Sequence, residues 1–456
     1  MLRAGVAKVD ITPPLGVPCS LGLDDACESV LDTPYIRATA LSDGIIAVCL
    51  LAADVIGLQH QTLADLRQVV SQATGLLPDA IIAHATHSHE APSVHIALNK
   101  ELQPYGLQYT DPAYYQSFLR SAAEAAQTAL ANMSPVAVAW GRGRVMGVAS
   151  NRRIVDENGQ VYMRWSNSNA ELRDYPEGDI DPWVRLLLLQ ESGGQGQVLI
   201  LNYCCHPTAA GGDEERYVTA DFPGEAMRLL EKEEQSRSCL YFTGPCGNVN
   251  PGKYTGDAGT IEDRVRDVRR LGSRLAEGVR LALAAVEPID ADGLRLMREA
   301  VALPVRQEMP SAEQLRAHLD KAVQRYREAK LANKRLAGGG DIRRLAHRLA
   351  FLRLSQDGAI PTEVVAVGIG GATICFLPGE CFLELAQGLW GRFPHLNLQI
   401  VAPTDYSVSY VPTPEAYRLG GYEAEVANVG PQAFGILLEA ATQALQRLYP
   451  ETVCLR

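Results

Sequence analysis

The chain has 456 residues, of which 47% are hydrophobic and 21% are charged, and its formal net charge at pH 7 is −11. This composition is ordinary for a globular protein, and the length suffices for one large α/β domain or two ordinary ones. The negative charge argues against nucleic acid or an anionic membrane surface as the main partner. No run of about 18 apolar residues predicts a transmembrane segment, and no apolar signal core follows Met1, so we predict a cytoplasmic protein.

Alternating and helical patterns predict strands and helices along the whole chain. Strand patterns are short apolar runs or alternate with period two, whereas helix patterns repeat every three to four residues between capping signals. In the first third of the chain they predict strands at 6–12, 36–41, 45–51 and 81–83, with a helix at 61–72 before the last of these, and a helix at 111–133. In the middle they predict strands at 136–140, 183–189 and 197–203, a helix from about 225, a strand at 239–242 and a helix at 260–286. In the last third they predict two charged helices within 311–354, strands at 364–367, 372–376 and 398–402, and a closing helix at 431–448.

The stretch 81–92 contains three of the nine histidines, His84, His87 and His89. Its first residues read as a buried strand, and open α/β sheets place their sites beyond the carboxyl ends of such strands. His87 and His89 are two residues apart, so on an extended chain they point the same way. Such a pair can hold a metal or divide into one ligand and one proton carrier, although loop histidines bonded to backbone explain the same pattern.

Polar residues also follow other predicted strands. The strand 197–203 runs into His206-Pro207-Thr208, and the strand 239–242 leads to a turn that contains Gly247, Asn248 and Asn250. Glycines and amides in a turn can approach a ligand closely, as oxyanion stabilisation requires, and a plain tight turn explains the same residues.

Two further segments offer groups that could contact a substrate. Asn151 and Arg152 present an amide and a guanidinium in a loop, which suits a substrate carbonyl or carboxylate but favours a surface ion pair. The tyrosine-rich segment 406–423 could cover a pocket or provide interfacial packing. The helices within 311–354, with basic pairs Lys334-Arg335 and Arg343-Arg344, are typical of a solvated insertion, with a lid or an oligomer contact as the alternative.

Buried strands therefore end in His87, His206, Gly247-Asn248 and Glu380. We predict a mixed α/β fold with a largely doubly wound sheet, helices on both faces, and a metal site where the strand ends meet. Two histidines and one glutamate form a common catalytic zinc set that leaves room for water.

The motifs along the chain resemble the neutral/alkaline, non-lysosomal ceramidase family. They recur in the family's order over nearly the whole chain, which makes the resemblance more specific than any single motif. The matching segments are Ala4-Gly5-Val6-Ala7-Lys8-Val9-Asp10-Ile11-Thr12-Pro13-Pro14, Thr86-His87-Ser88-His89, His206-Pro207-Thr208, Ala220-Asp221-Phe222-Pro223-Gly224, Gly247-Asn248-Val249-Asn250-Pro251, Pro378-Gly379-Glu380 and Tyr410-Val411-Pro412-Thr413-Pro414-Glu415-Ala416-Tyr417.

The resemblance implies a zinc site and an amide hydrolase. Zn²⁺ would be bound by His87, His206, Glu380 and Tyr410, and His89 would help proton transfer or substrate binding. Zinc lowers the pKa of bound water toward about 7 and polarises an acyl carbonyl, which fits amide hydrolysis. Tyr410 would also stabilise the developing oxyanion.

This chain departs from the family pattern at two motifs. Glu90-Ala91 stands where the family has S-G before proline, and Asn250 stands where the family has a serine held important for catalysis. We therefore expect a zinc amidohydrolase, related to lipid metabolism, that acts on a smaller or more polar N-acyl compound than ceramide.

We expect residues 1–456 to form one ceramidase-like domain with a helical insertion at 311–354. We expect no C-terminal immunoglobulin-like domain of the kind found in secreted ceramidases, and a homo-oligomer is possible.

Two alternatives to the amidohydrolase are a zinc esterase or lactonase on the same site and a catalytically silent protein that holds a structural metal in a closed ligand shell.

Overall fold

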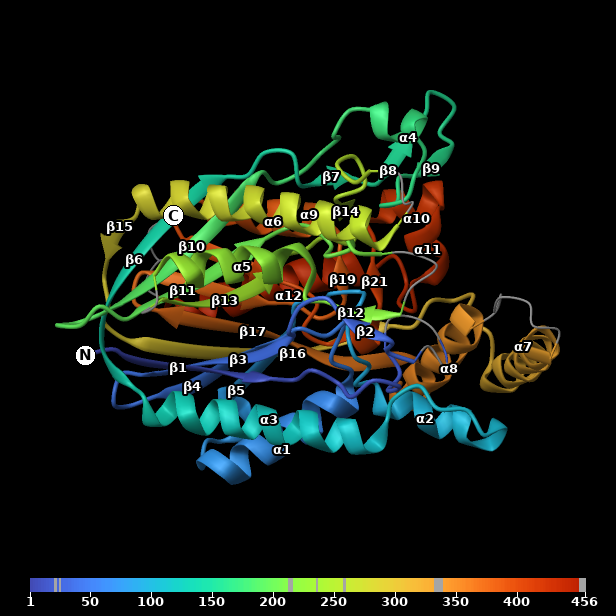
Figure 1. Cartoon of the computed structure of the whole chain (residues 1–456), viewed down its shortest axis with the longest axis horizontal. Coiled ribbons are helices and arrows are strands. Elements are labelled where there is room, and N and C mark those ends of the chain that lie inside the picture. The colour runs from blue at the N-terminus through green and yellow to red at the C-terminus, as the bar shows by residue number, and fades with distance from the viewer. Residues whose placement is uncertain are drawn as a thin grey trace.

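The computed structural model describes residues 1–19, 23, 26–211, 216–234, 237–256, 260–331 and 339–450. Its centre is two β-sheets packed face to face (Figure 1). The larger sheet has nine strands, in the order β13 (Arg237–Thr243), β11 (Gln197–Tyr203), β10 (Trp183–Glu191), β6 (Ser134–Arg144), β1 (Arg3–Asp10), β3 (Tyr35–Ser42), β4 (Ala47–Ala53) and β5 (Ile81–Ala85), with β15 (Glu287–Ile289) beside β6. The smaller sheet has the order β16 (Leu294–Pro304), β17 (Ala359–Ile369), β18 (Ala372–Phe376) and β20 (Asn397–Val401).

A shared apolar core joins the inner faces of the two sheets. Alternate side chains such as Leu50, Leu187 and Ile200 from the larger sheet pack with Val367 and Ile374 from the smaller one. Because strand side chains alternate between faces, the other half of each strand is left to pack on helices. The burial of these apolar side chains is the main contribution to the stability of the domain.

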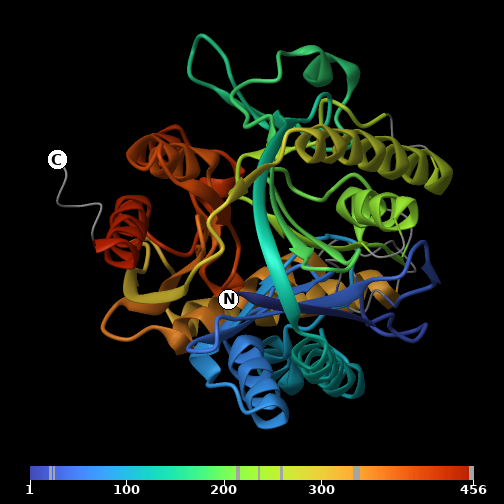
Figure 2. The same cartoon turned by 90° about the vertical axis from the view of Figure 1, so that its left-hand side faces the viewer.

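Three pairs of helices cover the outer faces of the sheets. Figure 2 shows them at separate positions around the strongly twisted sheets, with the pair from the N-terminal part of the chain at the bottom. The pairs are α1 (His60–Thr74) with α3 (Pro112–Ala131), α5 (Asp221–Glu233) with α6 (Ile261–Ala284), and α9 (Leu383–Arg392) with α12 (Ala433–Leu448). The predicted mixed α/β class with helices on both faces is therefore confirmed, in the form of two stacked sheets rather than one.

Local signals explain where several elements begin and end. The strands predicted at 36–41 and 45–51 are confirmed as β3 and β4, which pair antiparallel around the turn at Asp43. Asp111 caps α3 by accepting from the Tyr114 amide, and Thr260 starts α6 with a capping box. The helix expected from about 225 begins earlier, at Asp221, because Pro223 lies in its first turn, where proline is tolerated.

Short elements lie between and beside the sheets. The loop predicted around Asn151 and Arg152 contains two short strands, because the backbone there pairs with neighbouring segments. The short pairs are β2 (Ser29–Val30) with β12 (Tyr217–Val218), β7 (Ser150–Asn151) with β14 (Val249–Asn250), β8 (Arg153–Val155) with β9 (Val161–Met163), and β19 (Glu380–Cys381) with β21 (Tyr410–Val411). The remaining helices are α2 (Ile96–Leu102), α4 (Ala170–Asp174), α10 (Pro414–Leu419) and α11 (Tyr422–Val426), with single 3₁₀ turns at Pro78–Ala80, Gln103–Tyr105 and Tyr406–Val408.

The two charged helices predicted within 311–354 are α7 (Ala312–Leu331) and α8 (Gly339–Leu354). They pack on α2 and on each other through their own apolar cluster, which includes Leu319, Tyr326 and Leu349. The predicted basic pair Lys334-Arg335 lies outside the described residues. Within the described ranges, no helix has the length and apolar character that a bilayer crossing requires.

Candidate metal centre

His87 lies just after β5, separated from it by Thr86, and is held in an uncommon backbone conformation. Its φ is 71°, in the left-handed region that residues other than glycine rarely adopt. The preceding residue, Thr86, is fixed in place, because its hydroxyl donates to Asp54 Oδ1 at 3.1 Å. Asp54 in turn forms a buried ion pair with Arg37 at 3.0 Å. The fold thus determines where the His87 ring points.

Backbone carbonyls orient two of the histidine rings. His87 Nδ1 lies 2.6 Å from the Ile56 carbonyl oxygen, and His206 Nδ1 lies 2.5 Å from that of Cys246. A carbonyl can only accept, so Nδ1 carries the proton in both rings and the lone pair is on Nε2. This is the arrangement by which proteins orient histidines that bind a metal.

Both Nε2 atoms meet one carboxylate oxygen. Glu380 Oε2 lies 3.3 Å from His87 Nε2 and 3.1 Å from His206 Nε2. All three side chains are buried. The structure therefore brings together two predicted metal ligands from β5 and β11 with a third from the segment after β18, although these residues are far apart in the sequence.

His89 joins the same group. The possible ligand atoms of His87, His89 and His206 lie within 4.8 Å of one another, so the three histidines could hold a metal ion. His87 Nε2 and His89 Nε2 are both buried without a hydrogen-bond partner in the described structure. Buried polar nitrogens without partners are costly, and a metal or a substrate group would satisfy them. Imidazole and carboxylate ligands suit zinc and also accept other divalent metals.

Tyr410 lies beside this group. β19 and β21 pair in parallel with Glu380 opposite Tyr410, and the Tyr410 ring stacks with the His206 ring at a centroid distance of 6.4 Å and an angle of 22° (Figure 1 labels both strands). Gly379 precedes Glu380 with a φ of 73°, and a side chain at Gly379 would meet the Ser409 carbonyl oxygen. A glycine is thus needed for the two strands to approach.

Burial and neighbouring charges set the protonation of the group. Burial lowers the pKa of His206 to about 4, helped by the charge of Arg152. Burial and the neighbouring histidines hold the pKa of His89 well below its usual range. Burial alone would raise the pKa of Glu380, but the neighbouring His206 and His87 outweigh this effect and hold that pKa well below its usual range. The neutral imidazoles of His206 and His89 and the ionised carboxylate of Glu380 are the forms that bind a divalent metal.

Arg152 lies among aromatic rings at the edge of this group. Its guanidinium carbon is 5.3 Å from the centre of the Tyr410 ring and 5.2 Å from that of Trp165. Its charge is paired, since Nε donates to Glu423 Oε1 at 2.7 Å and Nη2 donates to the Gly247 carbonyl oxygen. Arg152 is therefore buried next to Tyr410, in place of the surface ion pair that the sequence favoured.

The other predicted substrate-binding residues make contacts within the protein. Asn151 donates to the Asp179 carbonyl oxygen, and Asn250 donates to that of Arg164. Asn248 donates to Glu384 and accepts from the Leu383 amide. A side chain at Gly247 would lie 2.5 Å from the Glu380 carbonyl oxygen, so glycine is required there. These contacts fix the turn around Glu380, and substrate binding by the four residues stays a prediction.

Sequence reasoning missed the contact of α8 with Tyr406. Together they border the group on the His87 side, and we call this border the α8 wall. The Tyr406 ring lies 5.7 Å from the His87 ring and stacks with those of His95 at 5.2 Å and His347 at 5.8 Å. Arg343, one turn before His347, also hydrogen-bonds Tyr406. The signal in the sequence was the i, i+4 spacing of Arg343 and His347 on a helix that otherwise reads as a solvated insertion.

A mixed α/β fold of two stacked sheets, with histidines and a glutamate gathered at strand ends, defines a protein that could hold a metal ion. Among solved structures, the chain is similar to neutral ceramidase from Pseudomonas aeruginosa, with a TM-score of 0.73 and 15% sequence identity over 98% of this chain and 75% of that one. It is also similar to a ceramidase complexed with C2, with a TM-score of 0.70 and 14% identity over 98% of this chain and 76% of that one. No protein-family model and no curated protein sequence matches. The chain therefore has the neutral ceramidase fold, which supports the resemblance seen in its motifs.

Proposed function

We propose that this protein is a zinc-dependent hydrolase that cleaves the amide bond of an N-acyl compound. The observation that carries the proposal is the meeting of His87 Nε2 and His206 Nε2 at Glu380 Oε2, with each Nδ1 fixed on a backbone carbonyl. The neutral ceramidase fold supports the reaction class, because the structural neighbours are ceramidases. As the chain departs from the ceramidase motifs at Glu90 and Asn250, we propose a substrate smaller or more polar than ceramide.

We assign the metal to His87, His206, Glu380 and Tyr410. When bound, a divalent metal would polarise the acyl carbonyl and provide an activated water near neutral pH. Arg152 beside the Tyr410 ring favours negative charge at this position, which suits an oxyanion. His89 is assigned to proton transfer, since its buried Nε2 is free to accept a proton and return it to the leaving amine.

The described elements fit one catalytic domain with α7 and α8 as an insertion. The two sheets share a core, and α7 and α8 have an apolar cluster of their own. We therefore propose a single catalytic domain into which α7 and α8 are inserted.

The proposal is tested by elemental analysis of protein purified without added metal or a histidine tag. We expect about one zinc per chain, loss of the metal in His206→Ala, and retention of the metal but at least about 100-fold lower activity in His89→Ala. His395→Ala is the matched control, because His395 is exposed and does not belong to the histidine group that could hold a metal.

Hydrolysis of N-acyl amides and matched esters is then measured with and without a chelator. Amide cleavage that the chelator abolishes supports the proposal. Cleavage of esters alone would favour the esterase alternative, and full activity of His206→Ala would exclude the zinc site.

A further inference from the structure

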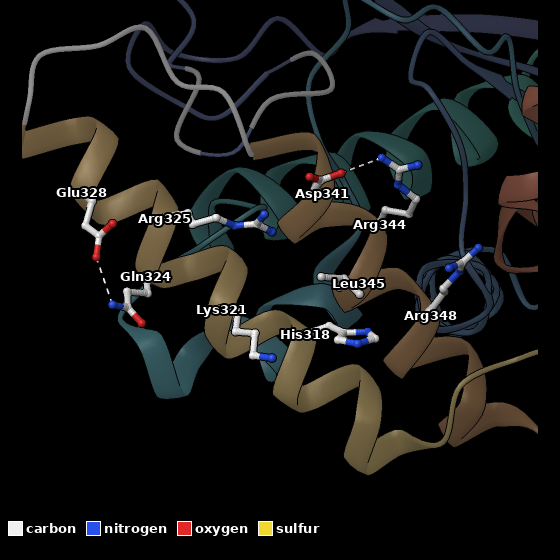
Figure 3. Close-up of a pocket in the computed structure, with 9 residues that line it drawn as sticks. All are labelled: His318, Lys321, Gln324, Arg325, Glu328, Asp341, Arg344, Leu345 and Arg348. Carbon is white, nitrogen blue, oxygen red and sulfur yellow. Dashed lines mark hydrogen bonds and ion pairs between the residues drawn. The ribbon is translucent and has the colours of Figure 1, made fainter.

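Helix α8 presents two different faces to its surroundings. On one side, Arg344 and Arg348 face a groove of about 560 Å³ between α7 and α8, which Figure 3 shows with His318, Lys321 and Arg325. There Arg344 pairs with Asp341 at 2.7 Å, so its charge is compensated at the surface. None of the predicted metal ligands lines this groove. The neighbouring positions Arg343 and His347 lie on the other face, four residues apart, as helix geometry requires for adjacent side chains.

The face of α8 with Arg343 and His347 is connected to the candidate metal centre through one aromatic ring, that of Tyr406. Arg343 and His347 both contact Tyr406, and the Tyr406 ring contacts His87. Tyr406 is held firmly, because its amide donates to the Leu58 carbonyl oxygen and its ring packs so closely on Gly57 that a Cβ there would lie 2.4 Å from Tyr406 Cγ. The position of Arg343 relative to the centre is thus set by rigid packing.

The charge of Arg343 has no compensating carboxylate in the part of the chain that the structure describes. Its neighbours there are the hydroxyl-bearing side chains of Tyr109, Tyr406 and Tyr422. The nearby carboxylates are engaged elsewhere: Glu380 with His87 and His206, Glu423 with Arg152 and Arg153, and Asp405 with the Ser407 amide and His60. Arg343 Nε and His347 Nε2 are both buried without a hydrogen-bond partner among the residues that the structure describes. Burial and the charge of Arg343 lower the pKa of His347 to about 4, so its ring is neutral and Arg343 is the cation.

We infer that Arg343 and His347 form a binding site for an anionic group of the substrate, so that the preferred substrate is an N-acyl compound that carries a carboxylate. This inference rests on the proposed function. A half-buried guanidinium without an ion pair is costly unless an anion completes it, and its planar set of donors matches a carboxylate. Hydrolysis of such a compound breaks the acyl C–N bond, adds the hydroxyl of water to the acyl carbon and transfers a proton to the amine, so it needs no further reactant.

The test compares matched probes that differ only in charge. In the first pair, N-hexanoylglycine carries a carboxylate on its amine half, and N-hexanoylglycinamide is the neutral counterpart. In the second pair, a monoamide of succinic acid carries a carboxylate on its acyl half, and the corresponding diamide is the neutral counterpart. For each pair, kcat/KM and calorimetric affinity are measured for the wild type, Arg343→Gln, Arg343→Lys and Arg344→Gln.

We expect the wild type to prefer the anionic member of one pair by about 10- to 100-fold, as a hydrogen bond to a charged group provides. Arg343→Gln should reduce this preference to near one, and Arg343→Lys should retain part of it. Arg344→Gln is the matched control, since it removes the same charge from the other face of α8, and it should retain the full preference.

The outcomes separate this inference from the proposed function. A preference that is absent in the wild type, or unchanged in Arg343→Gln, would overturn the inference while amide hydrolysis stands. Binding of the anionic probe that depends on Arg343, without cleavage of any probe, would support the anion-binding site but reject the hydrolase and, with it, the preferred substrate. Neither binding nor cleavage would reject both.

Discussion

Two arginines border the candidate metal centre, and their charges are handled differently. Arg152 lies beside Tyr410 with its guanidinium bonded to Glu423 and to the Gly247 carbonyl oxygen. Arg343 lies beside Tyr406 without a carboxylate among the described residues. A buried cation with its own carboxylate, such as Arg152, is complete within the protein, whereas we infer that the half-buried Arg343 is completed by a ligand. The comparison assigns Arg152 to holding the site together and Arg343 to selecting what enters it.

The largest expected effect comes from removing the carboxylate that completes Arg152. Glu423 is fully buried and accepts from Arg152 at 2.7 Å and from Arg153 at 2.6 Å. We expect Glu423→Gln to lower the free energy of unfolding by about 3 kcal/mol, because it leaves a buried guanidinium without its counter-charge. Urea titration measures this change.

The matched control is Glu425→Gln on the same short helix, where the side chain is exposed, and it should change the free energy of unfolding by less than about 0.5 kcal/mol. Arg343→Gln should change it by less than about 1 kcal/mol, because no ion pair is broken. If Arg343→Gln proves as destabilising as Glu423→Gln, the two arginines have the same structural role and the contrast between them is wrong.

A smaller effect is expected at Gly247, which connects Arg152 to the proposed metal ligand Glu380. Its carbonyl oxygen accepts from Arg152, and a Cβ at this position would lie 2.5 Å from the Glu380 carbonyl oxygen and 3.0 Å from that of Cys381. Backbone atoms cannot move aside as a flexible side chain can. Gly247→Ala should therefore cost about 1–3 kcal/mol of stability and lower zinc affinity by roughly 10-fold.

Zinc affinity is measured by competition with a chelator and stability by urea titration. Gly435→Ala in α12 is the control, since a Cβ there meets nothing within 4 Å, and it should be neutral or slightly stabilising. Wild-type zinc affinity in Gly247→Ala would show that the turn does not position Glu380.

The ends of the buried strands were predictable because each combines an apolar run with a polar residue that has no reason to be in a core. This pattern led to His87, His206 and Glu380, which the structure brings together. The stacking of two sheets was not predictable, since strand patterns give the period of a strand and not its neighbours. Likewise the turn at Asn248 reads the same whether its amides face a ligand or cap α9, as they do here.

The α8 wall was not predictable for a different reason. Arg343 and Arg344 are adjacent, equally charged residues on one amphipathic helix, and only the packing of that helix decides which of them faces the site. The packing depends on long-range contacts with α2 and with the 3₁₀ turn at Tyr406. Sequence periodicity gives the faces of a helix but not the partner of each face.

The smallest expected effect concerns the ion pair between His60 and Asp405, the residue before Tyr406. The Asp405 carboxylate, 3.8 Å from His60 Nδ1, raises the pKa of His60 above its usual 6.5, against the opposing effect of burial. Since the folded state binds the proton more tightly than the unfolded chain, the ion pair stabilises the fold fully below about pH 6.5 and its contribution is lost as the pH rises through the folded-state pKa. His60 is half-exposed, so solvent screening limits this contribution to less than about 1 kcal/mol.

The difference in unfolding free energy between the wild type and His60→Gln should therefore be larger at about pH 5.5 than at about pH 8.5. In an Asp405→Asn background, where asparagine can still cap the Ser407 amide, this difference should no longer vary with pH, and a variation that persists there would mean that His60 is stabilised by a group other than Asp405.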